Sequence, residues 1–282
     1  MSNRFLYRIL CGFFLGLSVF LPGLSGSVVA IIMGIYQDIL RIISNPFKKL
    51  KENIIFCIPL GIGVGISAIL FVLVFNYLFE TYEKAAYLLF VGLIAGNLPV
   101  IYTEIKKHEF KKNYLFGGVI AFIMVIVISM LSMENTQSLG VESIGLIRLT
   151  ISGFFAGIVA LVPGMSVSSI LIIFGVYSQL LFIAETLIRF NFNYLIHFAL
   201  FGGCAVCGLV LAAGSIKAAF EKNPGFANVS VFGFMTGSLI GILVQSLLMT
   251  DNNFNWLFGS IMLAVGLGIS MLFIVLGKTM NK

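Results

Sequence analysis

Two short segments rich in proline, glycine and serine are the best candidates for chemistry in this sequence. They read PGLSGS at 22–27 and PGMSVSS at 163–169, and each interrupts an apolar stretch with no charged residue at the break. Proline ends a helix, glycine permits close backbone approach, and serine caps the helix that follows. A helix restarting there would present unpaired N–H groups and its positive dipole end, a suitable binding site for phosphate.

The predicted binding residues come from both segments, with two arginines as candidates to guide an anionic head group toward them. The phosphate-binding candidates are Pro22, Gly23, Ser25, Gly26, Ser27, Pro163, Gly164, Ser166, Ser168 and Ser169, and the guiding candidates are Arg148 and Arg189. Simpler interpretations stay open. Each Pro-Gly pair could kink a long helix, with the serine hydroxyls hydrogen-bonding to the backbone groups that the kink leaves unpaired, and the arginines could be charges at helix ends. No catalytic residue, metal ligand or cofactor is predicted, because no nucleophile-base pair or metal-ligand spacing accompanies these serines.

The two segments belong to an internal repeat. Residues 12–40 align without gaps on 153–181, with 13 identical pairs in 29 positions at an offset of 141. At the same offset, the glycine pair at 92 and 96 falls on the pair at 233 and 237. These pairs predict close helix packing. The chain is therefore predicted to be a duplication, with repeats at 1–141 and 142–282.

The elements that position these segments are predicted to be membrane helices. Hydrophobic residues make up 60% of the chain and charged residues 10%, with a mean hydropathy of +1.10. In soluble domains, apolar residues make up about 45–50% and charged residues about 25%. Each repeat contains five apolar segments, at 5–21, 24–41, 54–79, 85–103 and 113–132, and at 147–162, 165–184, 194–216, 229–249 and 255–277. We predict an all-α polytopic bundle of two inverted-topology repeats, each with a re-entrant hairpin and three spanning helices, although two ordinary crossings in place of the hairpin stay open.

The distribution of basic residues predicts the orientation. With the N-terminus inside, 14 of the 17 lysines and arginines fall on the inner side and 3 on the outer side. Cytoplasmic loops carry this excess. Both termini and the loops 42–53 and 105–112 should therefore face the cytoplasm, while 80–84 and 133–147 face out of a bacterial inner membrane. Glu80 and Glu221 occupy equivalent positions at helix ends beside Lys84 and Lys222, which favours solvated charge pairs at the membrane rim over coupling carboxylates.

Three strings carry a resemblance to a known family: FLPGLSGSVVAIIMGIY, the later PGMSVSSILIIFGVY, and GLIAGNLPVIYTEIKK. Together they resemble the PopT-type polyprenyl-phosphate transporters, formerly a bacterial membrane domain of unknown function. The resemblance implies movement of undecaprenyl phosphate from the outer to the inner leaflet, for reuse in cell-wall polymer synthesis. Val167 replaces the family-like glycine in the second segment, so the two segments need not bind phosphate equally.

Two other functions stay open. The same sites would suit a transporter or channel for a small anionic solute, and an intramembrane lipid-phosphate phosphatase is a third possibility. The partners expected are the polyprenyl-phosphate lipid and membrane lipids, without nucleic acid. The residues predict neither a coupling ion nor an oligomeric state.

Overall fold

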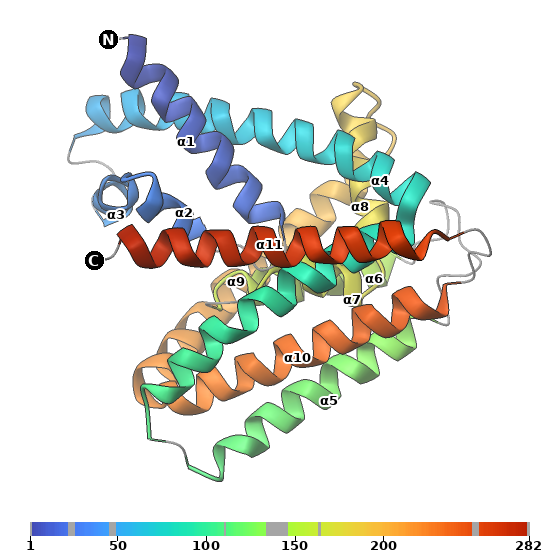
Figure 1. The fold of residues 1–282 in the computed structure, drawn as a ribbon. Helices are drawn as coiled ribbons and strands as arrows, with labels where there is room; N and C mark the ends of the chain where they lie inside the picture. The colour runs from blue at the N-terminus through green and yellow to red at the C-terminus, as the bar shows by residue number, and fades with distance from the viewer. Residues whose placement is uncertain are drawn as a thin grey trace.

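The computed structural model describes residues 2–21, 26–44, 49–109, 111–133, 146–162, 165–249 and 254–280 (Figure 1). Throughout these ranges the regular structure is helical. The helices are α1 (Ser2–Phe20), α2 (Gly26–Ile32), α3 (Tyr36–Ser44), α4 (Leu50–Lys106), α5 (Tyr114–Met133), α6 (Leu146–Val159), α7 (Val167–Ile173), α8 (Tyr177–Ile188), α9 (Leu195–Lys222), α10 (Pro224–Leu248) and α11 (Trp256–Met280). The predicted all-α class is confirmed.

Five of the described helices are long and apolar enough to cross a membrane: α4, α5, α9, α10 and α11. The longest, α4, has 57 residues and a non-helical residue inside it, Tyr82, with φ −138° and ψ 49°. This kink divides α4 into an arm at 50–81 and an arm at 83–106, called α4a and α4b below. The segments predicted at 54–79 and 85–103 are thus the two arms of one kinked helix.

The apolar segments at 24–41 and 165–184 are each broken in two, a feature that was not predicted from the sequence. Each consists of two short helices, α2 with α3 and α7 with α8, which meet at Gly34 or Gly175. Both glycines have φ 65°, a left-handed conformation that is unfavourable for residues with a Cβ atom. The axis turns by 114° between α7 and α8. Glycine at these positions therefore ends one helix and redirects the chain.

Close helix contacts hold the long helices together at glycines, as the repeated pairs predicted. A Cβ atom built on Gly92 of α4b would lie 2.2 Å from the Leu263 carbonyl oxygen of α11. One built on Gly233 of α10 would lie 2.0 Å from the Gly118 carbonyl oxygen of α5. Gly92 and Gly233 are equivalent at the offset of 141. Each fourth apolar segment therefore packs against the last helix of the other half of the chain.

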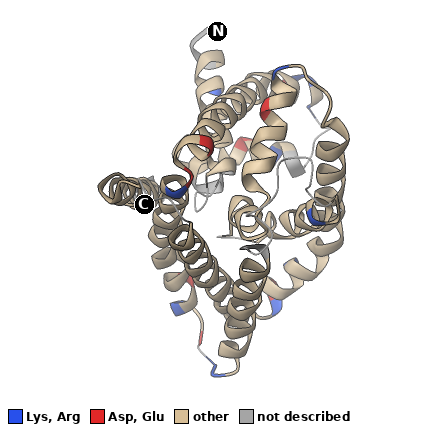
Figure 2. Ribbon diagram, turned by 90° about the vertical axis from the view of Figure 1, so that its right-hand side faces the viewer, with Lys and Arg blue, Asp and Glu red and all other residues tan. Residues whose placement is uncertain are grey.

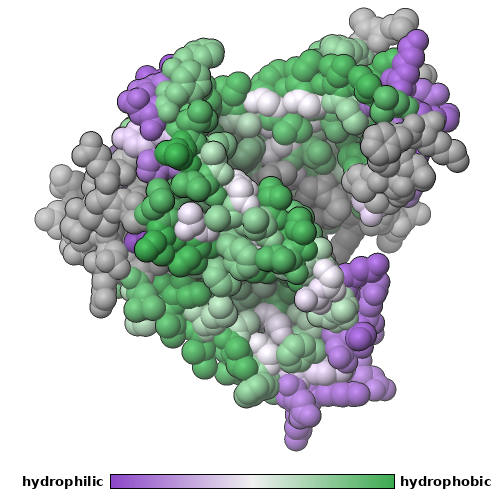
Figure 3. Space-filling view, turned by 180° about the vertical axis from the view of Figure 1, so that it is seen from behind, coloured by the Kyte–Doolittle hydropathy of each residue, from purple (hydrophilic) through white to green (hydrophobic). Residues whose placement is uncertain are grey.

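The long helices form a bundle whose exposed middle is apolar. α4b and α10 pack side by side and run in opposite directions, and both chain termini lie at the same end of the bundle (Figure 1). Charged residues lie mostly near helix ends (Figure 2), and broad apolar surfaces separate the polar regions (Figure 3). Along α9, for example, Gly208 alone among the described residues is buried. This surface suits a multi-pass membrane protein. The predicted boundary at 141/142 lies outside the described residues, and the duplication and inverted orientation stay predictions.

Candidate functional site

A small pocket lies where α7 meets the two long helices α4b and α10. Three of its lining residues carry hydroxyl groups, and the others are apolar. They are Ser166, Ser169 and Ser238, with Ile94, Met165, Phe234 and Met235. The volume open to the centre of a water-sized sphere is about 10 Å³, roughly enough for one water molecule. The pocket must therefore widen to admit a larger polar group.

The local structure before α7 leaves two of these hydroxyls unused. Ser166 is the N-cap residue, with extended backbone angles of φ −118° and ψ 134°, and its side chain makes no capping hydrogen bond. Its carbonyl oxygen accepts the Ser169 N–H at 3.2 Å. The Ser169 side chain is 4% exposed, and no hydrogen bond is found for its hydroxyl within the described ranges. Both serines can therefore donate a hydrogen bond into the pocket.

The third hydroxyl comes from a spanning helix. Ser238 lies on α10 and donates to the Phe234 carbonyl oxygen one turn earlier, at 2.8 Å. A serine hydroxyl has one proton and can rotate between acceptors. Ser238 can therefore turn from this backbone carbonyl toward an anion in the pocket.

Ser168 has a different role from its two neighbours. It is buried, and its hydroxyl donates at 2.5 Å to the carbonyl oxygen of Phe20, at the end of α1. This contact joins the end of α1, just before the first Pro-Gly segment, to the start of α7, just after the second. The single hydroxyl proton of Ser168 is thus engaged in holding two parts of the chain together.

Several predicted binding residues lie outside the described residues: Pro22, Gly23, Ser25, Pro163 and Gly164. The backbones of Gly26 and Ser27 begin α2, but the Ser27 side chain is also outside what is described. The role of these residues therefore stays a prediction, as does the meeting of both segments as re-entrant tips.

The two candidate arginines do not line the pocket and contact residues elsewhere. The Arg148 Nε of α6 donates at 2.7 Å to the carbonyl oxygen of Phe174, the C-cap residue of α7. Arg189 follows α8, and its side chain is 71% exposed and pairs with Glu185 at 2.5 Å. Arg148 thus supports the bend between α7 and α8, and neither arginine lines the pocket. Their guidance of a head group stays a prediction.

Near the α4 kink, the structure does not place every charged residue in solvent as predicted. Lys84 is 7% exposed, so its assignment to solvent was wrong. Its ammonium lies 4.6 Å from the Trp256 ring centroid and 4.9 Å from that of Phe254, and its one hydrogen-bond acceptor among the described residues is the Met249 carbonyl oxygen at 3.4 Å. The aromatic rings stabilise the cation by cation–π attraction. Glu80 is exposed and accepts instead from the amide of Asn76, at 3.0 Å.

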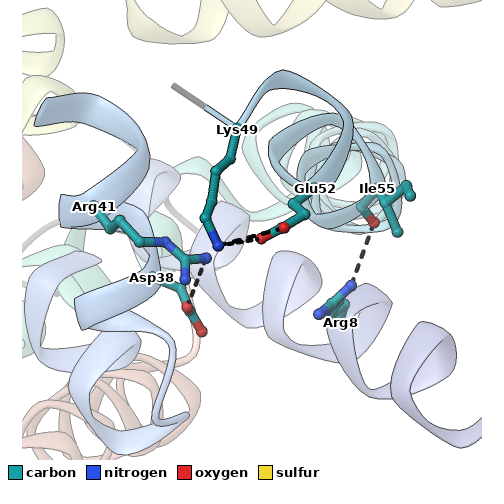
Figure 4. A network of polar contacts seen from close by, with 6 residues as sticks. All are labelled: Arg8, Asp38, Arg41, Lys49, Glu52 and Ile55. Atoms are coloured by element: carbon teal, nitrogen blue, oxygen red, sulfur yellow. Dashed lines mark hydrogen bonds and ion pairs between the residues drawn. The ribbon is translucent and has the colours of Figure 1, made fainter. Parts of the chain in front are cut away.

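A second group of charges lies on α1, on α3 and at the start of α4 (Figure 4), and none of these residues lines the pocket. Arg8 donates to the Ile55 carbonyl oxygen at 3.3 Å. Asp38 pairs with Arg41 at 3.0 Å, and Lys49 pairs with Glu52 at 3.1 Å. These exposed pairs contribute little to stability, about 0–1 kcal/mol each. They mark the polar end of the bundle and are not a candidate site.

Sequence reasoning missed the contribution of the long helices to the pocket. Ile94 and Met235 both line it, and they are equivalent at the offset of 141. A signal was present in the second half, because Ser238, which lines the pocket, directly follows the glycine pair at 233 and 237. These glycines predicted helix packing alone. The polar residue beside them would have indicated the pocket.

Comparison with known proteins gives consistent results. Residues 15–257 match the undecaprenyl phosphate translocase-like family. A Staphylococcus aureus protein named Polyprenyl-phosphate transporter is 27% identical over 269 residues, covering 94% of each chain. A Vibrio cholerae protein of the same name is 26% identical over 257 residues, covering 86% of this chain and 77% of the relative. No solved structure matches.

Proposed function

The chain belongs to the undecaprenyl phosphate translocase-like family, and we propose that it carries undecaprenyl phosphate across the bacterial cytoplasmic membrane. The observation that carries this proposal is the family match over residues 15–257. The near-complete coverage of both named polyprenyl-phosphate transporters supports it. So does the set of apolar helices long enough to cross a membrane. The protein acts as a transporter of this lipid and leaves its phosphate ester intact.

The phosphate head group binds in the pocket between α4b, α7 and α10. Ile94 and Met235 lie near the middle of their spanning helices, so the pocket is near the middle of the membrane. A phosphate is costly to bring to this depth unless donors replace its water. The hydroxyls of Ser166, Ser169 and Ser238 supply such donors. The residues predicted in the 22–27 segment add further donors.

Among the described residues, the pocket is lined by hydroxyls and apolar groups without a charged side chain, and this composition suits a carrier. Hydrogen bonds to a charged group contribute about 1.5–3 kcal/mol each. A few of them hold the head group while still allowing its release, whereas buried arginines would retain it. The isoprenoid tail remains in lipid, alongside the apolar outer faces of the helices.

The lipid moves from the outer to the inner leaflet between two inverted repeats, 1–141 and 142–282. Support comes from the excess of basic residues on one side and from both termini lying at one end of the bundle (Figure 1). The two Pro-Gly segments act as re-entrant tips from opposite sides. Cysteines placed at Lys48 and Glu142 should label from the cytoplasmic and outer side, respectively. Labelling of both positions from one side would end the inverted-repeat proposal.

Reconstitution in liposomes tests the function. The purified protein should move labelled undecaprenyl phosphate between leaflets without releasing inorganic phosphate. Release of phosphate would identify a phosphatase, and uptake of small anions without lipid movement would identify a solute transporter. Either result contradicts the proposal, as does the absence of any lipid movement above that of protein-free liposomes.

A further inference from the structure

We infer that Asn97 forms a second position for the phosphate head group, next to the serine pocket and on the side opposite Ser238. This inference rests on the proposed function and adds a step to it. The head group would be held first beside Ser238 and then beside Asn97 as it crosses the membrane.

The placement of Asn97 follows from its helix and from the internal repeat. Ile94 of α4b and Met235 of α10 line the pocket, and Ser238 lies three residues after Met235. Asn97 lies three residues after Ile94, so it occupies the position in α4b that Ser238 occupies in α10. Residues three apart share a helix face and are separated by about 4.5 Å along the axis. Asn97 is therefore on the pocket-facing side of α4b, one turn further along.

The opposite directions of the two helices set the order of these positions. α4b and α10 pack together and run antiparallel (Figure 1). A step of one turn along α10 from Met235 therefore leads toward one end of the bundle. The same step along α4b from Ile94 leads toward the other end. Ser238 lies toward the end that carries the α4 kink, and Asn97 lies toward the end that carries both termini. In the proposed orientation these are the outer and the cytoplasmic side.

The side chain of Asn97 lacks a partner although it is buried. It is 8% exposed, and its amide forms no hydrogen bond within the part of the chain that the structure describes. Its amide atoms are not fully enclosed, because neither is among the fully buried, unpaired polar atoms of the described residues. The amide can therefore be reached by a ligand beside it. Its NH₂ group has two donors that suit a phosphate oxygen. A ligand that arrives during transport would pair this amide.

Three substitutions at this position separate binding from movement. Asn97→Leu removes the donors at similar size, Asn97→Asp places a carboxylate that repels phosphate, and Asn97→Ser supplies the group found at the equivalent position. Translocation of labelled undecaprenyl phosphate in liposomes should slow by about tenfold in N97L, because a hydrogen bond to a charged group is lost. It should slow further in N97D, because the added carboxylate repels the phosphate. N97S should stay within about threefold of the wild type. The affinity of the detergent-solubilised protein for a short-chain prenyl phosphate should change less than about threefold in N97L, because the serine pocket is intact.

Gln245→Leu is the control for the loss of a buried amide: Gln245 lies on α10, donates to the Tyr87 hydroxyl at 3.4 Å and does not line the pocket. It should leave the translocation rate unchanged. If N97L and N97D both translocate the lipid as fast as the unmodified protein, the inference is overturned. The proposed function would still stand, because the unmodified protein moves the lipid. N97D is close in shape to asparagine and provides the decisive rate if N97L lowers the melting temperature. A failure of the unmodified protein to move the lipid would instead overturn the function itself.

Discussion

The region of α2 and α4b and the equivalent region of α7 and α10 share their packing residues but differ in the polar residues near the pocket. Gly34 and Gly175 make the same left-handed bend, and Gly92 and Gly233 make the same close helix contact. The polar positions have changed: the equivalents of Ser169 and Ser238 are Val28 and Asn97.

In the proposed inverted-repeat carrier, this difference separates helix packing, which both halves share, from head-group binding, which they need not share. Helix contacts have to be alike if two halves are to move between related arrangements. The polar groups around the proposed head-group site need not be alike, because in the proposed transport the lipid binds from one side of the membrane and leaves to the other. Unequal hydrogen-bonding groups along the path would give it a direction of easier release.

The largest expected effect concerns the shared packing. Gly233→Val and Gly92→Val place a side chain about 2 Å from a backbone carbonyl of the neighbouring helix, so α5 or α11 must separate from its partner. Both variants should lose folded protein, measured by yield and by a thermal melt in detergent. Gly203→Val on α9, where nothing lies within 4 Å, is the control and should fold normally. Normal melting of the Gly92 and Gly233 variants would refute equal roles in packing.

A smaller effect is expected at the polar positions of the second half. Replacing Ser166 and Ser169 together with Ala removes two donors from the pocket. The translocation rate should fall by about tenfold or more, since hydrogen bonds to a charged group contribute about 1.5–3 kcal/mol each. The melting temperature should change little because neither hydroxyl is engaged in the fold. Ser230→Ala serves as the control, since Ser230 is half-buried on α10 beside Gly117 of α5 and does not line the pocket. An unaltered transport rate in the double variant would place the head group elsewhere.

The smallest effect concerns the matching bends. Gly34→Ala meets no neighbouring atom within 4 Å, so its cost comes from the backbone conformation alone. Placing a Cβ atom at φ 65° costs about 1–2 kcal/mol, and asparagine should reduce that cost. Chemical denaturation should therefore rank glycine, asparagine and alanine in decreasing stability at positions 34 and 175. A different order at the two positions would mean that the bends are not equivalent.

Much of the fold could be predicted because its signals are local. Apolar segments of spanning length and glycine pairs follow from composition and spacing, and they describe α4b, α5, α10 and α11 well. The breaks at Gly34 and Gly175 were missed, since both lie inside apolar runs where glycine alone does not distinguish a bend from close packing. The burial of Lys84 depends on Phe254 and Trp256, which are remote in sequence. The pocket likewise depends on how α7 meets α4b and α10, which no single segment specifies.

Photo-crosslinking tests the central claim most directly: the head group of undecaprenyl phosphate occupies the pocket between α4b, α7 and α10. A diazirine-bearing residue is placed at Met165, which lines the pocket, and at Leu257, which is 71% exposed on α11. Lipid labelled on its phosphate should crosslink at position 165, and unlabelled undecaprenyl phosphate should compete while undecaprenol should not. Equal labelling at both positions, or equal competition by undecaprenol, would contradict the account.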